Sequence, residues 1–208
     1  METPRGFGVA KRAVAMLARP DRTFDRVGEE SGDLRGLFRR YVAPLAAIPA
    51  VCGVIGPLIF GFNVYNVGIH MSVVGLILEA AVGYLLTLAA VYGLGLFVEL
   101  TAPWFGGVRS RDRAMRAVAY SATAVWVAGL AELYPNLGLP LGVLAALWSL
   151  YALYLGLAKL MAIPEERRLV AFAVVLLALA VLGVARGMAV AKAAELGGPL
   201  SASYAPRR

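Results

Sequence analysis

Reactive side chains are scarce in this sequence. Its 208 residues include one cysteine, Cys52, and one histidine, His70. A single cysteine cannot form an intramolecular disulfide, and no Cys/His spacing typical of a metal site occurs. The HExxH, GxSxG, Walker A and GxGxxG patterns are also absent. Few groups remain for general-base or nucleophilic catalysis, so the sequence predicts no enzyme activity, no metal and no cofactor.

Charged residues are also few. Only 16% of the chain is charged and 60% is hydrophobic, whereas soluble domains are about a quarter charged and about half apolar. This composition is typical of a membrane protein. The net charge of +7 does not indicate nucleic-acid binding, because the basic residues cluster between apolar blocks. We therefore expect the lipid bilayer as a partner and no nucleic acid.

Five apolar runs are each long enough to cross about 30 Å of hydrocarbon at about 1.5 Å per residue. None shows the polar stripe of a soluble amphipathic helix. The sequence predicts an all-α polytopic membrane protein with about five transmembrane helices in one bundle. The predicted spans are residues 41–62, 73–100, 114–134, 140–161 and 169–190.

Polar segments flank the predicted transmembrane domain of residues 41–190. Residues 1–40 form a basic cytosolic head, in which Val9–Ala18 and Pro20–Glu30 are predicted short helices. Two arrangements are open for this head: helices that lie at the membrane interface, or a solvated head packed on the ends of the spans. Residues 191–208 form a short polar tail.

The orientation follows from the distribution of lysine and arginine. The head carries nine of them, and the links after the second and fourth spans carry four and three. The links after the first and third spans carry none. The positive-inside rule then predicts a cytoplasmic N-terminus and a C-terminus outside.

Ionisable side chains within apolar spans are the first candidates for a functional site. The topology puts Glu79, Glu132 and Arg186 near the outer ends of their spans, with Arg186 about one turn from the end, and His70 in the preceding outer loop. Small residues lie on the same helix faces as these side chains, which indicates close contact between the helices. We predict a polar cluster of these four residues. Three alternatives are open: a structural ion-pair network, an ion, proton or solute site, and unrelated side chains that snorkel to the interface.

Two further patterns lie in the fourth span. Lys159 ends this span at a depth similar to that of Glu99, so the two are predicted to meet at the inner end. Trp148, Tyr151 and Tyr154 are spaced three apart. They form either aromatic core packing or a stacking surface for a lipid or quinone.

Parts of the sequence resemble prokaryotic members of the Yip (Ypt-interacting protein) family. The head contains a proline, an aromatic and an acidic residue in the family's order, "FGGVRSRDRAMRAVAYSATAVW" is similar to the family's loop and third span, and the run after Pro135 is similar to its fourth span. The family-motif positions in this chain are Pro20, Phe24, Glu29, Gly106, Gly107, Tyr151, Tyr154, Gly156 and Pro164.

The sequence also departs from the family pattern. Ala124 and Val125 stand where many relatives carry proline, and the longer head motif of the eukaryotic branch is missing. The resemblance implies five spans in the same orientation. Eukaryotic Yip-like proteins act in vesicle trafficking and bind small Rab-type GTPases, so a small GTPase partner is implied by the resemblance alone. Prokaryotic members have no well-defined activity.

Three functions agree with these observations. The first is a non-enzymatic membrane organiser or trafficking-type scaffold that works through its head and its lipid contacts. The alternative is a small ion or solute permease or channel, which uses the intramembrane glutamate and arginine residues in a homo-oligomer. The third is a membrane-embedded subunit that binds other membrane proteins. The resemblance favours a prokaryotic plasma membrane as the location.

Overall fold

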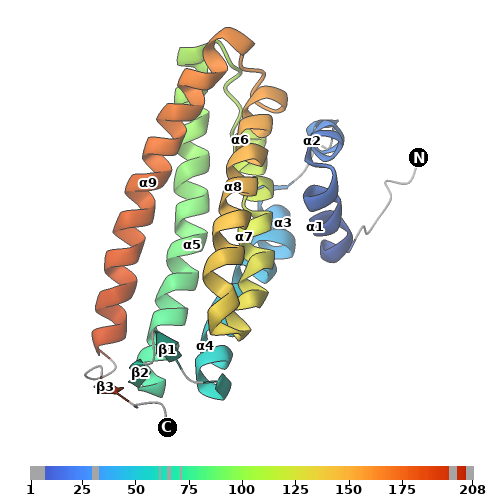
Figure 1. The fold of residues 1–208 in the computed structure, drawn as a ribbon. Coiled ribbons are helices and arrows are strands. Elements are labelled where there is room, and N and C mark those ends of the chain that lie inside the picture. The colour runs from blue at the N-terminus through green and yellow to red at the C-terminus, as the bar shows by residue number, and fades with distance from the viewer. Residues whose placement is uncertain are drawn as a thin grey trace.

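The computed structural model describes residues 8–29, 33–60, 62–64, 67–70, 72–196 and 201–204. Within this part, five helical segments are long and apolar enough to cross a membrane. They confirm the predicted all-α fold with five spans in one bundle (Figure 1). The segments are Leu34–Phe60, Val73–Phe105, Arg111–Leu133, Leu137–Lys159 and Glu165–Leu196.

The first span is built from three consecutive helical elements, α3 (Leu34–Leu37), the π-helix η1 (Phe38–Val42) and α4 (Ala43–Phe60). The Asp33 side chain caps α3, because it accepts hydrogen bonds from the backbone N–H groups of the next turn. Two prolines, Pro49 and Pro57, lie inside α4. Each proline lacks a backbone N–H, so the carbonyl group four residues before it loses its usual partner. Neighbouring groups have to satisfy that carbonyl.

The third span forms the centre of the bundle. It consists of α6 (Arg111–Ser121), α7 (Thr123–Ala128) and the 3-10 helix η3 (Gly129–Leu133). About two thirds of its most apolar stretch (67%) is buried, against 11–28% in the other four spans. These other spans expose most of their apolar surface, which is the face that lipid would cover.

The second and fifth spans are long helices that lie side by side (Figure 1). They are α5 (Val73–Thr101), which continues into the 3-10 helix η2 (Ala102–Phe105), and α9 (Glu165–Leu196). The fourth span, α8 (Pro135–Lys159), packs mainly on α6, α7 and η3. The helix α9 therefore depends chiefly on α5 for its contacts inside the molecule.

A small antiparallel sheet, which the sequence did not predict, joins two distant parts of the chain. Its strands are β1 (Phe62–Val64), β2 (Val67–His70) and β3 (Ser201–Tyr204), in the order β1-β2-β3. The first two strands occupy the link between the first and second spans, and β3 belongs to the predicted polar tail. The sheet lies at the lower end of the bundle in Figure 1, which we name the sheet end.

The head forms two helices with nearly the predicted bounds, α1 (Val9–Ala18) and α2 (Pro20–Glu29). The helix α1 packs on α7, and α2 packs mainly on α8. The Phe24 side chain is fully buried and Val27 is 3% exposed. The head is therefore packed on the bundle, and a position of its helices at the membrane interface stays a prediction.

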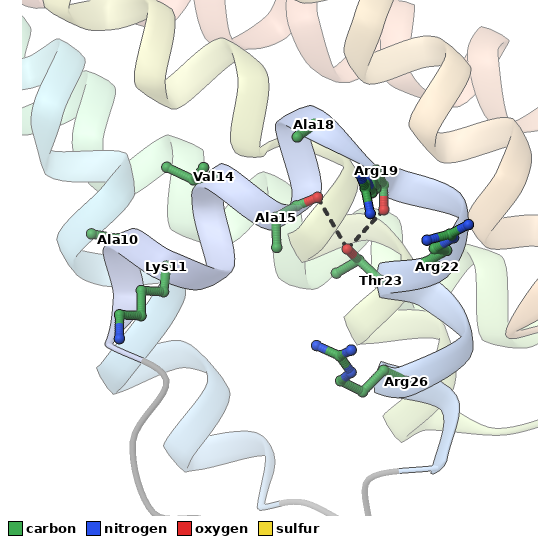
Figure 2. A pocket seen from close by; sticks show the side chains of 9 residues that line it. All are labelled: Ala10, Lys11, Val14, Ala15, Ala18, Arg19, Arg22, Thr23 and Arg26. Atoms are coloured by element: carbon green, nitrogen blue, oxygen red, sulfur yellow. Dashed lines mark hydrogen bonds between the residues drawn. The ribbon is translucent and has the colours of Figure 1, made fainter.

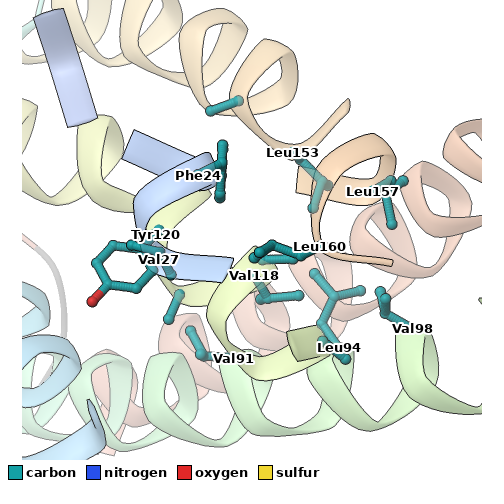
Figure 3. Close-up of a cluster of buried hydrophobic side chains, with 14 of the residues drawn as sticks. Phe24, Val27, Val91, Leu94, Val98, Val118, Tyr120, Leu153, Leu157 and Leu160 are labelled. Atoms are coloured by element: carbon teal, nitrogen blue, oxygen red, sulfur yellow. The ribbon is translucent and has the colours of Figure 1, made fainter. Parts of the chain in front are cut away.

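One apolar core joins the head to three spans. Phe24 of α2 belongs to one cluster of buried side chains together with residues of α5, α6 and α8 (Figure 3). The connections at 106–110 and 160–164 lie at the end of the bundle opposite the sheet end (Figure 1). Basic residues surround both connections, so we name this the basic end. That this end faces the cytoplasm stays a prediction from the positive-inside rule. The core residues labelled in Figure 3 are Phe24, Val27, Val91, Leu94, Val98, Val118, Tyr120, Leu153, Leu157 and Leu160.

Candidate functional site

The candidate site is a partly open polar cavity of about 240 Å³ lined by residues of α4, α5, α9 and η3. Three of the four residues predicted for the polar cluster, Glu79, Glu132 and Arg186, line this cavity. They come from three different spans, so the structure brings together side chains that are far apart in the sequence. The remaining lining residues are Ala46, Pro49, Ala50, Gly53, Leu76, Ala80, Tyr84, Thr87 and Val190.

Arg186 is held against α5 by a threonine and a glycine. Its Nε donates a hydrogen bond to Thr87 Oγ1 at 3.2 Å, and Thr87 Oγ1 donates to the Gly83 carbonyl at 2.8 Å. A Cβ atom added at Gly83 would lie 3.3 Å from Arg186 Nη2. The small residues predicted on this face of α5 therefore leave room for a guanidinium group.

Glu132 lies against the first span. Its Oε2 atom would be 2.9 Å from a Cβ atom at Gly53, and its carbonyl oxygen would collide with one at Gly56. A Cβ atom at Gly129 would lie 2.7–2.9 Å from Pro49. The first and third spans thus cross at a distance that only glycine permits, which places the Glu132 carboxylate at the cavity wall.

The three ionisable groups share the cavity without forming a closed network. In the described part of the chain, neither Glu79 nor Glu132 makes an ion pair with Arg186. The cationic guanidinium still faces two carboxylates across a narrow space, where attraction between opposite charges is stronger than in water. Such an arrangement can hold register between spans, or it can accommodate water or a small ion.

Arg186 lies further from the end of its helix than the predicted span end at Val190 implied. The helix α9 continues to Leu196, ten residues beyond Arg186. That separation is about 15 Å along the helix. The prediction ended the span at Val190, where the apolar run ends, but alanine residues carry the helix further. The depth of Arg186 in the membrane stays a prediction, and an unpartnered charge within the hydrocarbon is costly.

His70 is the last residue of β2, and its backbone pairs with Ser201 of β3. Its side chain lies outside the described part of the structure. The membership of His70 in the polar cluster therefore stays a prediction.

The predicted pair of Glu99 and Lys159 is wrong. Glu99 instead accepts from Arg111 Nε at 2.9 Å. Lys159 forms ion pairs with Asp21 at 2.8 Å and Asp25 at 2.7 Å, both on α2. The sequence alone did not show that the head would bring two carboxylates to the end of α8.

Several family-motif positions meet at the basic end. A Cβ atom at Gly156 of α8 would touch the Phe24 ring at 3.3 Å, so this glycine makes room for the head. Gly106 has a φ of 81°, which favours glycine, and lies against Pro164. A Cβ atom at Gly107 would lie 2.8 Å from the Met161 carbonyl oxygen. These positions therefore fix the two connections of the basic end and the seat of α2.

The other motif positions have separate surroundings. Pro20 is the buried first residue of α2, and Glu29 is its exposed last residue. Tyr154 packs edge-on against Phe172 at 5.6 Å, whereas Tyr151 is half exposed toward the lipid side. Trp148 and Tyr151 contact each other with ring centroids 5.6 Å apart, so Tyr154 is the residue of this row that packs on another span.

Arg116 has a structural role that its place in a basic link did not predict. Its side chain is buried, and its Nη1 donates to the Val27 carbonyl in the last turn of α2 at 2.8 Å. A second contact, an ion pair with Asp112 at 3.0 Å, keeps it oriented. The spacing of Asp112 and Arg116, four residues apart on one helix, was the only signal in the sequence.

The fold defines a multi-pass integral membrane protein with a helical head docked on its bundle. Residues 14–186 match the family model of the Yip1 domain, and the chain belongs to this family. It is similar to the Inner membrane protein YohC of Escherichia coli strain K12, with 30% identity over 159 residues that cover 74% of this chain and 80% of the relative. The same protein of E. coli strain CFT073 matches equally. No solved structure matches.

Proposed function

We propose that this protein is a non-enzymatic membrane organiser, which works through the exposed face of its head and through its lipid contacts in a prokaryotic plasma membrane. The observation that carries this proposal is the docking of α1 and α2. One face of this pair is buried on the bundle, with Phe24 at its centre, and the opposite face stays exposed. A head fixed in this way presents one defined surface to other molecules.

Family membership supports the proposal. The chain shares the Yip1 domain, and several of its family-motif positions form the seat of the head instead of lining the polar cavity. The relative YohC carries the name of an inner membrane protein, which supports the proposed location. A small GTPase partner is not part of the proposal, since the eukaryotic head motif is absent from this sequence.

The test is site-specific photo-crosslinking in native membranes. A photoreactive residue is placed at Arg22, on the exposed face of the head, and in a control variant at Arg167, which is exposed at the same end of the bundle. We expect a discrete and reproducible protein adduct from position 22 and none from position 167. Equal adducts from both positions, or no protein adduct from either, would contradict the proposal.

The second candidate is a small permease, which the polar cavity favours. Glu79, Glu132 and Arg186 line a cavity between the spans, and intramembrane charges often mark transport pathways. This function requires flux that depends on these residues. The organiser requires none, so the two proposals differ in a direct measurement.

A further inference from the structure

A second, larger concavity lies in the head. This groove has a volume of about 540 Å³ and runs between α1 and α2 on the face turned away from the bundle (Figure 2). Ligand sites for small molecules have volumes of about 300–1,000 Å³. The groove is therefore large enough for a compact ligand.

The floor of the groove is apolar. It is formed by side chains of α1 at helical spacing, namely Ala10, Val14, Ala15 and Ala18. Val14 is 63% exposed, although the same helix buries Ala13 and Met16 against the bundle. The helix α1 therefore has two apolar faces, and the bundle covers only one of them.

The rim of the groove is basic. Arg19, Arg22 and Arg26 line it together with Lys11, and none of the nine lining residues is acidic. Within the described ranges, the three arginine side chains form no ion pair. Arg22 and Arg26 are four residues apart on α2, and like charges at this spacing repel each other. A bound anion would turn this repulsion into attraction.

Two acidic residues of α2 are engaged outside the groove. Asp21 and Asp25 both pair with Lys159 of α8, on a face of the helix about 100° from that of Arg22 and Arg26. The Thr23 hydroxyl, which lies in the groove, donates to the carbonyl oxygens of Ala15 and Arg19 (Figure 2). Thr23 thus ties the two walls together and leaves the guanidinium groups as the donors for a ligand.

The length of the first span relates the groove to the membrane. About twenty helical residues cross the hydrocarbon core, and this length reaches from Phe60 back to Tyr41 on the first span. The Tyr41 ring packs on Tyr120 at 4.6 Å. The Tyr120 hydroxyl accepts a hydrogen bond from Arg12 of α1 at 2.8 Å. If the first span crosses the hydrocarbon from Phe60, α1 is level with the lipid headgroups.

We propose that this groove binds an anionic phospholipid from the leaflet at the basic end. The guanidinium groups of Arg19, Arg22 and Arg26 hold the phosphate, since guanidinium donors match phosphate oxygens. The apolar floor around Val14 covers the first methylene groups of an acyl chain. This site deepens the proposed organiser function and rests on it, because it names the ligand class of the head.

The test is native mass spectrometry of the full-length protein in neutral detergent. The protein is titrated with phosphatidylglycerol and with phosphatidylcholine of identical acyl chains. The groove variant carries Arg19→Gln, Arg22→Gln and Arg26→Gln. The control variant carries the same number of exchanges at exposed arginines of the same end, Arg109→Gln, Arg113→Gln and Arg167→Gln.

We expect the wild type and the control variant to bind the first phosphatidylglycerol at least tenfold more tightly than phosphatidylcholine, and the groove variant to lose this preference. The single changes Arg22→Gln and Val14→Asn, both at exposed positions, should each weaken the preference if the triple variant does not fold. An unchanged preference in the groove variant, or an equal loss in the control variant, would overturn the proposal.

Soluble glycerol phosphate is the second probe. If it displaces phosphatidylglycerol at equal concentration, the ligand is a soluble phosphate and the lipid site is refuted. If Val14→Asn weakens the lipid but leaves glycerol phosphate unchanged, the apolar floor is confirmed as a chain contact. A failed lipid site would not remove the protein adduct expected at position 22, so the two proposals fail separately.

Discussion

Phe24 is the largest fully buried side chain in the described part of the chain, and it joins α2 to the bundle. Truncation of a buried phenylalanine to alanine costs about 3–5 kcal/mol. The ion pairs of the head are weaker, because Asp21 and Asp25 are 59% and 57% exposed where they pair with Lys159, and exposed ion pairs contribute about 0–1 kcal/mol. We therefore expect Phe24→Ala to release the head.

Hydrogen exchange measures this release. A loss of about 3 kcal/mol in the docking free energy raises the undocked population of the head at least a hundredfold, because about 1.4 kcal/mol changes an equilibrium constant tenfold. The amides of α1 and α2 should exchange faster by this factor, while those of α5 and α9 stay unchanged. Val14→Ala, at an exposed position, is the matched control and should have no effect. Unchanged exchange in α2 of the Phe24→Ala variant would refute the docking argument.

Two further changes test the spans. Gly129→Ala should lower the melting temperature by several degrees, because its Cβ atom would meet the Pro49 backbone, whereas Gly183→Ala points into open space and should not. Arg186→Leu should destabilise the wild type more than a Glu79→Gln, Glu132→Gln background in thermal unfolding, if attraction across the cavity matters. Additive losses would mean that these groups do not interact.

The helices were largely predictable because their signals are local. Apolar runs of sufficient length indicated the spans, and Pro20 separated the two head helices at the observed position. The shared level of Glu79 and Glu132 followed from counting residues along antiparallel spans, and the structure places both at one cavity. The length and the periodicity of the apolar runs were therefore enough to predict most of the helices.

Docking between distant segments was not predictable in the same way. The ion pairs of Lys159 depend on where the head packs, and they join residues more than 130 positions apart. The groove between α1 and α2 depends on the angle between two helices, which no pattern within either helix specifies. Arg116 resembled the other basic residues of its link, although its side chain is buried under α2. Only tertiary packing distinguishes the buried Arg116 from the exposed basic residues of the same link.

The central claim is that the head, and not the polar cavity, is the working part of this protein. The most direct measurement is flux of protons, common ions and small solutes through sealed liposomes that contain the purified, folded protein. Glu79→Gln changes the cavity, and Glu29→Gln, at the exposed end of α2, is its control. We predict flux equal to that of protein-free liposomes for all three proteins. Flux in the wild type and the control that Glu79→Gln abolishes would contradict the account and make the cavity a transport site.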